Sequence, residues 1–113
     1  MLNTELVSAS FEGARLDGAH FEKCNFADAL LVDASFREAT LIYSTFDRAR
    51  ASRADFSFGD LSECSFADAD VSFARFLAAN VFGVDFANAK CNGADFTDAS
   101  SVDTAAGLAE CRQ

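Results

Sequence analysis

The chain has 113 residues, half of them hydrophobic, and a formal net charge of −9 at pH 7. This length suits a single domain with a continuous core, and the apolar content is too high for a disordered segment. No apolar run reaches the roughly 20 residues of a membrane span, and the first residues include Glu5 but no basic segment. An acidic surface also disfavours nucleic acid and anionic membranes as direct partners. Composition therefore predicts one cytoplasmic domain.

A five-residue repeat organises the chain. From Leu6 to Phe96 every fifth residue is Leu, Phe, Ala, Val or Cys, and the residue two before it is usually Ala. We call this fifth residue the centre of its pentapeptide. A period of five fits neither an α-helix nor a flat strand, and fixed repeats are typical of stacked architectures. We expect the centres and the small residues to point inward and the other three residues to point outward.

A second period, four pentapeptides long, is superimposed on the first. Sorting the centres by this longer period gives two columns rich in phenylalanine: Leu6, Phe26, Phe46, Phe66 and Phe86, and Leu16, Phe36, Phe56, Phe76 and Phe96. Smaller centres fill the other two columns. If four pentapeptides close one coil, the two phenylalanine columns face each other across a narrow, well-filled core. Most of the residues that replace the small Ala also share one column: Thr4, Cys24, Ser44, Cys64, Val84 and Thr104. A coil of three pentapeptides explains neither pattern.

Charged residues support the same period. Residues stacked in neighbouring coils lie about 4.8 Å apart, where opposite charges attract and like charges repel. At a separation of four pentapeptides all charged pairs within the repeats are opposite: Asp17/Arg37, Asp28/Arg48, Arg48/Asp68, Asp33/Arg53, Arg50/Asp70, Asp70/Lys90, Asp55/Arg75 and Arg75/Asp95. The basic cluster Arg48, Arg50 and Arg53 is therefore interpreted as part of these ladders rather than as a phosphate site.

The corners of the coil are predicted two residues after each centre. Gly, Asn and Asp are frequent there, as at Gly13, Asp33 and Asn88. These residues tolerate the positive φ that a type II turn requires. Each side of the coil is then a short extended segment followed by a tight corner, and about five coils give a rod roughly 24 Å long.

The phrase Ala54-Asp55-Phe56 recurs with small changes, as in Ala69-Asp70-Val71, Ala79-Asn80-Val81 and Ala94-Asp95-Phe96. It resembles the pentapeptide-repeat family, whose pattern is Ala-(Asp/Asn)-(Leu/Phe)-x-x, over roughly residues 4 to 103. The resemblance implies an all-β fold, a right-handed quadrilateral parallel β-helix, or solenoid. Its best-understood members are bacterial proteins that bind DNA gyrase as mimics of duplex DNA and protect it from quinolones. Others resemble effector modules or regulatory scaffolds.

The repeat decays near the C-terminus. We expect a β-helix over residues 1–103 and a cap over residues 104–113, with a short helix within Asp103 to Cys111 whose N-cap is Asp103 or Ser101. Leu108 would then cover the end of the core. The first coil has no comparable cap, and an open edge invites pairing, so a weak homo-oligomer through an end coil is a further hypothesis.

The residues indicate no catalytic, metal or cofactor site. Cys24 and Cys64 share a column but lie two coils apart, beyond disulfide reach, and the spacing of Cys91 and Cys111 matches no zinc pattern. We expect all four cysteines to be reduced. His20 points outward beside Glu22, without a nucleophile nearby, so we expect no enzyme activity.

Function is therefore sought on the surface. Two sets of apolar residues stand at outward positions, where polar residues are usual. The first set is Ile42, Tyr43 and Phe82, and the second is Phe58, Phe73 and Leu77. Such residues mark a protein partner site or shield one another along the rod; we take Tyr43 and Phe82 as candidate anchors. The leading hypothesis is a non-catalytic protein-binding or scaffold module. The alternative is a DNA mimic that binds DNA gyrase or another DNA-handling enzyme through an acidic side: Glu5, Asp28, Asp47, Asp68 and Asp85.

Overall fold

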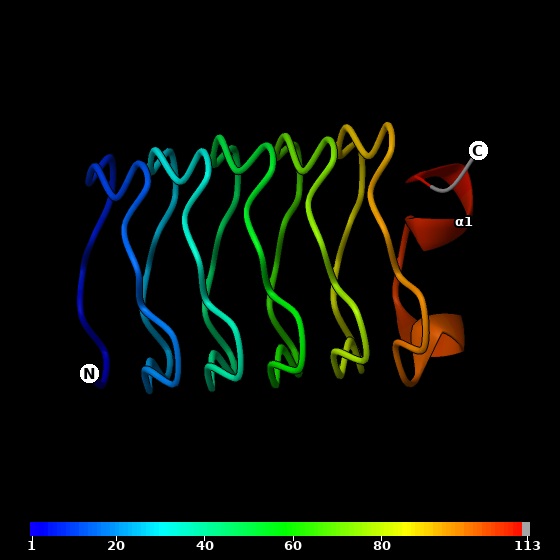
Figure 1. Cartoon of the computed structure of the whole chain (residues 1–113), viewed down its shortest axis with the longest axis horizontal. Coiled ribbons are helices and arrows are strands. Elements are labelled where there is room, and N and C mark those ends of the chain that lie inside the picture. Colours follow the sequence, from blue (N-terminus) through cyan, green and yellow to red (C-terminus); the bar gives the residue numbers. More distant parts are fainter. Residues whose placement is uncertain (112–113) are drawn as a thin grey trace.

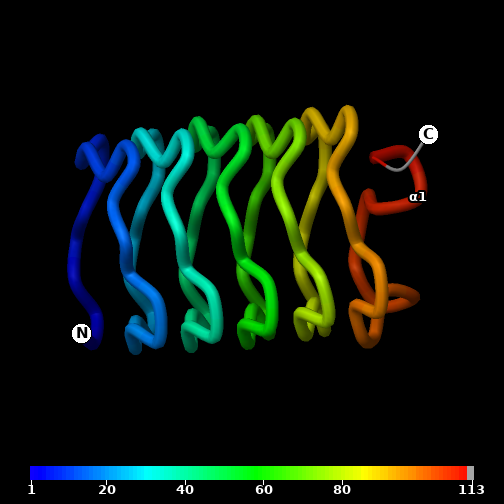
Figure 2. The backbone as a smooth tube through the Cα atoms, viewed as in Figure 1, coloured from blue at the N-terminus to red at the C-terminus, as the bar shows by residue number. Residues whose placement is uncertain are grey.

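The computed structural model describes residues 1–111, which form a rod of stacked coils measuring 31 × 19 × 19 Å (Figure 1). Each coil contains four pentapeptides, and the coils span residues 4–23, 24–43, 44–63, 64–83 and 84–103. The N-terminus lies at one end of the rod, and two short helices lie at the other. The tube in Figure 2 shows how the same path repeats from coil to coil.

Parallel backbone pairing joins residues that are one coil apart in the sequence. The residue before each centre bridges its counterpart in the next coil, from Glu5 with Asn25 to Asn80 with Ser100. The amide of Arg50, for example, donates to the carbonyl of Ala29 at 2.9 Å. Within residues 1–111 this pairing consists of isolated bridges rather than continuous strands, since a corner interrupts every side. The predicted four-sided coil is confirmed.

The corners hold left-handed backbone. Residues two after a centre have positive φ, with values from 53° to 73° along the chain. Gly, Asn and Asp occupy many of these positions, as predicted, but Tyr43, Phe58 and Phe73 also adopt φ near 60°. Left-handed backbone costs an L-residue with a side chain roughly 1–2 kcal/mol. The closed coil therefore imposes this conformation on whichever residue stands at the corner.

The core consists of the two predicted phenylalanine columns. Within a column the rings stack in parallel, with the Phe46 ring centroid 4.7 Å from that of Phe26 and 4.8 Å from that of Phe66. Between columns the rings meet edge to face, as for Phe46 and Phe56 at 5.9 Å and 78°. Both contact geometries are favourable for aromatic rings. The two columns thus face each other across the interior.

The charge ladders form only in part. Arg48 binds Asp28 at 3.1 Å, and Arg53 binds Asp33 at 2.8 Å, as predicted. The predicted Arg37–Asp17 pair is wrong, since the Arg37 guanidinium lies 3.0 Å from the Asp55 carboxylate. The Asp17 carboxylate is already occupied, because it accepts hydrogen bonds from the Ser35 hydroxyl and the Arg37 amide. The other predicted pairs within residues 1–111 are more than 4 Å apart.

The C-terminal segment differs from the single helix expected. A 3-10 helix, η1, spans Val102–Thr104, and an α-helix, α1, spans Leu108–Cys111. Between them Ala106 forms a parallel bridge with Asp85. The separation of these two residues is one position more than a full coil, so the chain begins another side with its register offset by one residue. Leu108 is buried over the end of the core, as predicted. No helix in the described part of the chain has the length and apolar character needed to cross a membrane.

Candidate interaction surfaces

Four aromatic side chains are exposed on the rod. Tyr43, Phe58, Phe73 and Phe82 are between 47% and 61% accessible. The first three have left-handed backbone at corners, whereas Phe82 is the first residue of the corner that follows the centre Val81, before the left-handed Gly83. Exposed aromatic rings are unfavourable in water and are enriched in protein interfaces, so they are the first candidates for a functional surface.

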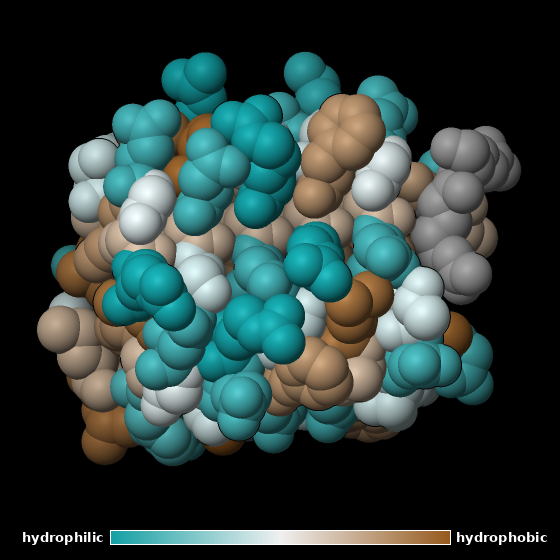
Figure 3. All heavy atoms as spheres, in the orientation of Figure 1, coloured by the Kyte–Doolittle hydropathy of each residue, from teal (hydrophilic) through white to brown (hydrophobic). Residues whose placement is uncertain are grey.

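Phe58, Phe73 and Leu77 lie along one part of the rod, which we call the Phe58 patch. It lies on the side whose centres include Phe56 and Phe76. The Phe58 amide donates to the Leu77 carbonyl at 2.8 Å, so the two residues are neighbours in adjacent coils. Phe73 stands at the corner where the side carrying Leu77 begins, and its ring lies over Gly93 of the next coil. On the face drawn in Figure 3, hydrophobic groups likewise interrupt a hydrophilic surface.

Two arginines border this patch, and they differ in their contacts with other side chains. Arg37 contacts Asp55 and also places its guanidinium carbon 5.0 Å from the centroid of the Phe58 ring, a cation–π contact. Burial tends to raise the pKa of the Asp55 carboxyl, but hydrogen bonds from Ser57 and Arg37 outweigh it and lower this pKa. Arg75, between Phe73 and Leu77 in the chain, is exposed and forms no ion pair with any residue from 1 to 111.

The second predicted apolar set is dispersed. Ile42 and Tyr43 belong to the coil of residues 24–43, whereas Phe82 belongs to the coil of residues 64–83. The intervening coil places the polar residues Ser62 and Glu63 at the corresponding positions. Ile42 is half-buried. Tyr43 and Phe82 therefore share a side but do not stack in adjacent coils.

The acidic side is largely engaged within the chain. Asp28 binds Arg48, and Asp47 accepts hydrogen bonds from the Ser65 hydroxyl and the Ala67 amide. Asp85 accepts from the Ala87 amide at 2.8 Å. Glu5 and Asp68 are at the surface. Most carboxylates on this side therefore stabilise corners or ladders.

Within residues 1–111 the polar side chains form no evident reaction centre. The His20 imidazole lies 3.6 Å from the Glu22 carboxylate, and both are at the surface. No group of three metal-ligating side chains gathers within residues 1–111. Cys24 and Cys64 are free and buried, and burial raises the pKa of the Cys64 thiol to about 12. Cys64 is therefore a thiol at neutral pH, which is a poor nucleophile.

The remaining cysteines correct the sequence-based expectation. Cys91 and Cys111 are paired in a disulfide, with Cα atoms 5.2 Å apart, so the prediction of four reduced cysteines is wrong for this pair. The residues are 20 positions apart, which is one coil, and α1 places Cys111 where a further coil would place its centre. This spacing of one coil was the sequence feature that could have indicated the disulfide, although it matches no metal-binding motif.

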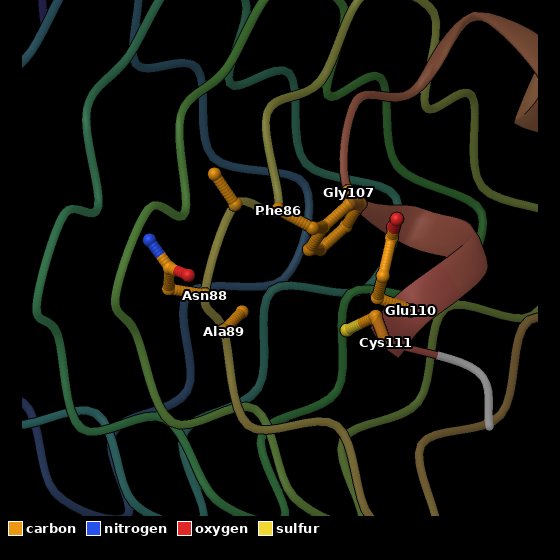
Figure 4. Close-up of a pocket in the computed structure, with 7 residues that line it drawn as sticks. Phe86, Asn88, Ala89, Gly107, Glu110 and Cys111 are labelled. Carbon is orange, nitrogen blue, oxygen red and sulfur yellow. The ribbon is translucent and has the colours of Figure 1, made fainter.

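An open groove accompanies this disulfide at the end of the rod. It has a volume of about 380 Å³ and is lined by Phe86, Ala87, Asn88, Ala89, Gly107, Glu110 and Cys111. Figure 4 shows Glu110 and Cys111 on α1 at one side, with Asn88 and Ala89 on the neighbouring coil. Nothing in the sequence pattern indicates this groove.

These features define a class: a right-handed, four-sided parallel β-helix with a short helical cap. The profile described as pentapeptide repeats matches eight copies, over residues 4–41, 21–57, 29–66 and 64–100. The chain belongs to the pentapeptide-repeat family. Comparison with curated proteins gave no match.

Solved structures share the fold. HetL, a pentapeptide repeat protein involved in heterocyst differentiation regulation from the cyanobacterium Nostoc sp. strain PCC 7120, is 26% identical, with a TM-score of 0.68 over 84% of this chain and 48% of HetL. QnrB1, a plasmid-mediated fluoroquinolone resistance protein, is 22% identical, with a TM-score of 0.73 over 94% of this chain and 52% of QnrB1. A protein of the Arabidopsis thaliana thylakoid lumen is 24% identical, with a TM-score of 0.65 over 89% of this chain and 67% of its own. The chain thus spans about half the length of HetL and QnrB1.

Proposed function

We propose that this protein is a non-catalytic binding module that docks a protein partner on the Phe58 patch. The observation that carries the proposal is the adjacency of Phe58 and Leu77 in neighbouring coils, with Phe73 on the same coil as Leu77. Phe58 and Phe73 are exposed by 51% and 61%. The rigid coil pre-organises these side chains, which lowers the entropic cost of binding.

Charge indicates the chemistry of the partner segment. Arg75 projects from the stretch between Phe73 and Leu77 and has no ion-pair partner within residues 1–111. A partner that buries the patch would also bring a group close to this guanidinium. We therefore propose a protein segment that presents a carboxylate between two apolar side chains, because an unpaired arginine in a buried interface is costly.

Affinity capture from the native host tests the proposal. The double variant Phe58→Asn, Phe73→Asn and the single variant Arg75→Glu should each lose the captured partner, while Arg75→Lys should keep most of it. The matched control is Tyr43→Asn with Phe82→Asn, which alters the dispersed apolar set and should leave capture unchanged. Loss of capture in the control alone would move the binding site to Tyr43 and Phe82 and contradict the assignment to the Phe58 patch.

DNA mimicry is the second candidate, favoured by the net charge of −9 and by the fold shared with QnrB1. Duplex DNA carries about one charge per 1.7 Å, so a mimic as long as this 31 Å rod needs a net charge of roughly −18. The net charge here is −9, and most carboxylates of the acidic side bind groups within the chain. We expect no effect on DNA gyrase supercoiling at micromolar protein. Inhibition abolished by Asp68→Lys would reverse the ranking of the two candidates.

The proposed compartment is the cytoplasm. Its thiol pools keep most protein cysteines reduced, and the disulfides that form there are usually transient and redox-sensing. The Cys91–Cys111 pair is compatible with that location only if its bond is made and broken under cellular conditions.

A further inference from the structure

We propose that Cys91 and Cys111 form a redox-controlled latch, which fastens α1 over the C-terminal end of the core and opens by thiol–disulfide exchange with a dithiol. This inference is independent of the proposed binding function. It rests on the position of the two cysteines, the small size of α1 and the groove beside Cys111.

The position of the pair follows from the coil geometry. Cys91 is a core centre of the last coil and is buried. Cys111 lies one coil period further along, and its Cα is 5.2 Å from that of Cys91, close to the spacing between stacked coils. The coil therefore positions Cys91, and α1 brings Cys111 to the place where the next coil would continue the column.

Few other contacts hold α1 in place. The helix has four residues, far fewer than an isolated helix needs for stability in water. Among them only Leu108 and Cys111 are buried. Gly107 joins the helix to the coil with φ 75°, and a Cβ there would meet the Phe86 backbone at 2.8 Å, so the chain passes close to the last coil. The disulfide is accordingly a large part of what anchors the cap.

Exchange is selective for this pair. Cys111 lines the open groove of about 380 Å³, and Figure 4 shows its sulfur pointing away from α1, on the side of Ala89. Cys24 and Cys64 lie in the interior of the stack and are about 1% accessible. Cys111 is itself buried, at 8% accessible, but it borders the groove, so we expect a small dithiol to reach its sulfur before the thiols of Cys24 and Cys64.

The chemistry is a two-electron reduction. A thiolate of the dithiol attacks Sγ of Cys111, the bond between the two protein sulfurs breaks, and Sγ of Cys91 leaves as a thiolate that takes a proton from water. The second thiol of the reagent then attacks the mixed disulfide. This step releases Cys111 as a thiol and leaves the reagent as a cyclic disulfide. Oxidised glutathione re-forms the bond between Cys91 and Cys111 through a mixed disulfide and is itself reduced to two molecules of glutathione thiol.

Opening the latch uncovers the end of the core. Leu108 and Cys111 leave the last coil, so the outer faces of Phe86 and Cys91 become accessible. Phe96, which is already half-buried, marks the adjacent end of the second column. An exposed apolar end of a β-helix is a surface for pairing or for chaperone recognition, and redox state would thus control whether that surface exists.

The test compares protein equilibrated with oxidised glutathione and protein reduced with dithiothreitol. Maleimide labelling after denaturation should modify two thiols in the oxidised protein, Cys24 and Cys64, and four in the reduced protein. Hydrogen exchange should rise by about 100-fold on reduction at the amides of Ala106 and Cys111. The amide of Asp55, bonded to Ala34 in the middle of the rod, should not change.

Two variants keep the result interpretable. In the Cys111→Ser variant, the amide hydrogen of Ala106 should exchange rapidly under both redox conditions, as it does in the reduced wild-type protein. Cys64→Ser should retain the full response, because Ser44 already occupies the same column in the preceding coil. Four labelled thiols in the oxidised protein, or equal protection of Ala106 in both redox states, would overturn the latch.

Discussion

At the scale of single residues, the corners show where this chain departs from its own repeat. Tyr43, Phe58 and Phe73 hold φ values of 58–63°, which glycine or asparagine adopts at lower cost. Their rings bury little surface in return, since all three are at least half exposed. The coil imposes this backbone at every corner, so the exposure of the rings, rather than their φ, distinguishes them. Phe58 and Phe73 fit the proposed binding role, whereas Tyr43 stands apart from the Phe58 patch.

The inward residues have the opposite character. Phe46 is fully buried and contacts Phe26, Phe36, Phe56 and Phe66 through its ring. We expect Phe46→Ala to lower the free energy of unfolding by about 3–5 kcal/mol, because it leaves a cavity that stacked coils cannot close. Urea denaturation measures the loss. Phe82→Ala, at an exposed aromatic, should stay within about 0.5 kcal/mol of wild type; equal losses in both variants would show that inside and outside are misassigned.

At the scale of one side of the coil, a repeated hydrogen bond explains the acidic residue before the centre. The carboxylate accepts from the amide two residues later, as Asp55 does from Ser57 at 2.9 Å and Asp70 from Ser72 at 3.0 Å. Asparagine does the same at Asn25 and Asn80, toward Ala27 and Phe82. The side chain thus substitutes for a backbone partner at the turn.

This hydrogen bond makes stability depend on pH. Burial tends to raise the pKa of Asp70, but the hydroxyl and amide of Ser72 outweigh it and lower that pKa below its usual value. A carboxyl with a depressed pKa stabilises the fold fully above its unfolded pKa, near 3.8, and loses that contribution as pH falls through the folded value. We expect the urea midpoint to fall between pH 5 and pH 2. Asp70→Asn should flatten part of this slope while preserving stability at pH 7, whereas Asp70→Ala should reduce stability at pH 7.

The sides and corners could be predicted because one constraint acts on every repeat. Each pentapeptide has inward residues at two places, and opposite charges recur one coil apart. Both patterns independently indicate the same four-sided coil. What escaped prediction depends on single side-chain choices. Arg37 reaches Asp55 because Ser35 already occupies Asp17, and Ala106 pairs with Asp85 because one extra residue offsets the register. The residues of the Phe58 patch were visible in the sequence, but the adjacency of Phe58 and Leu77 follows only from the stacking of the coils.

At the scale of the whole molecule, stability is additive along the rod, since each coil contacts only its neighbours. The register, rather than the length, then decides which shortened chains fold. Deleting residues 46–65 removes one full period and places Phe66 directly over Phe26, so both phenylalanine columns continue. Deleting residues 46–60 removes three pentapeptides and places Leu61 over Phe26 and Val71 over Phe36.

We therefore expect the chain lacking residues 46–65 to be more stable than the chain lacking residues 46–60, although it is one pentapeptide shorter. The misregistered core should cost the longer variant about 2 kcal/mol or more, through cavities on one side and overpacking on another. Both variants lose Arg48 and Arg53 and place an acidic residue over Asp28, and the variant lacking 46–60 also places Asp68 over Asp33, an exposed like-charge pair that adds a smaller penalty to the core defect. Urea denaturation of the two proteins measures the difference. Greater stability in the variant lacking 46–60 would show that the columns do not govern the fold.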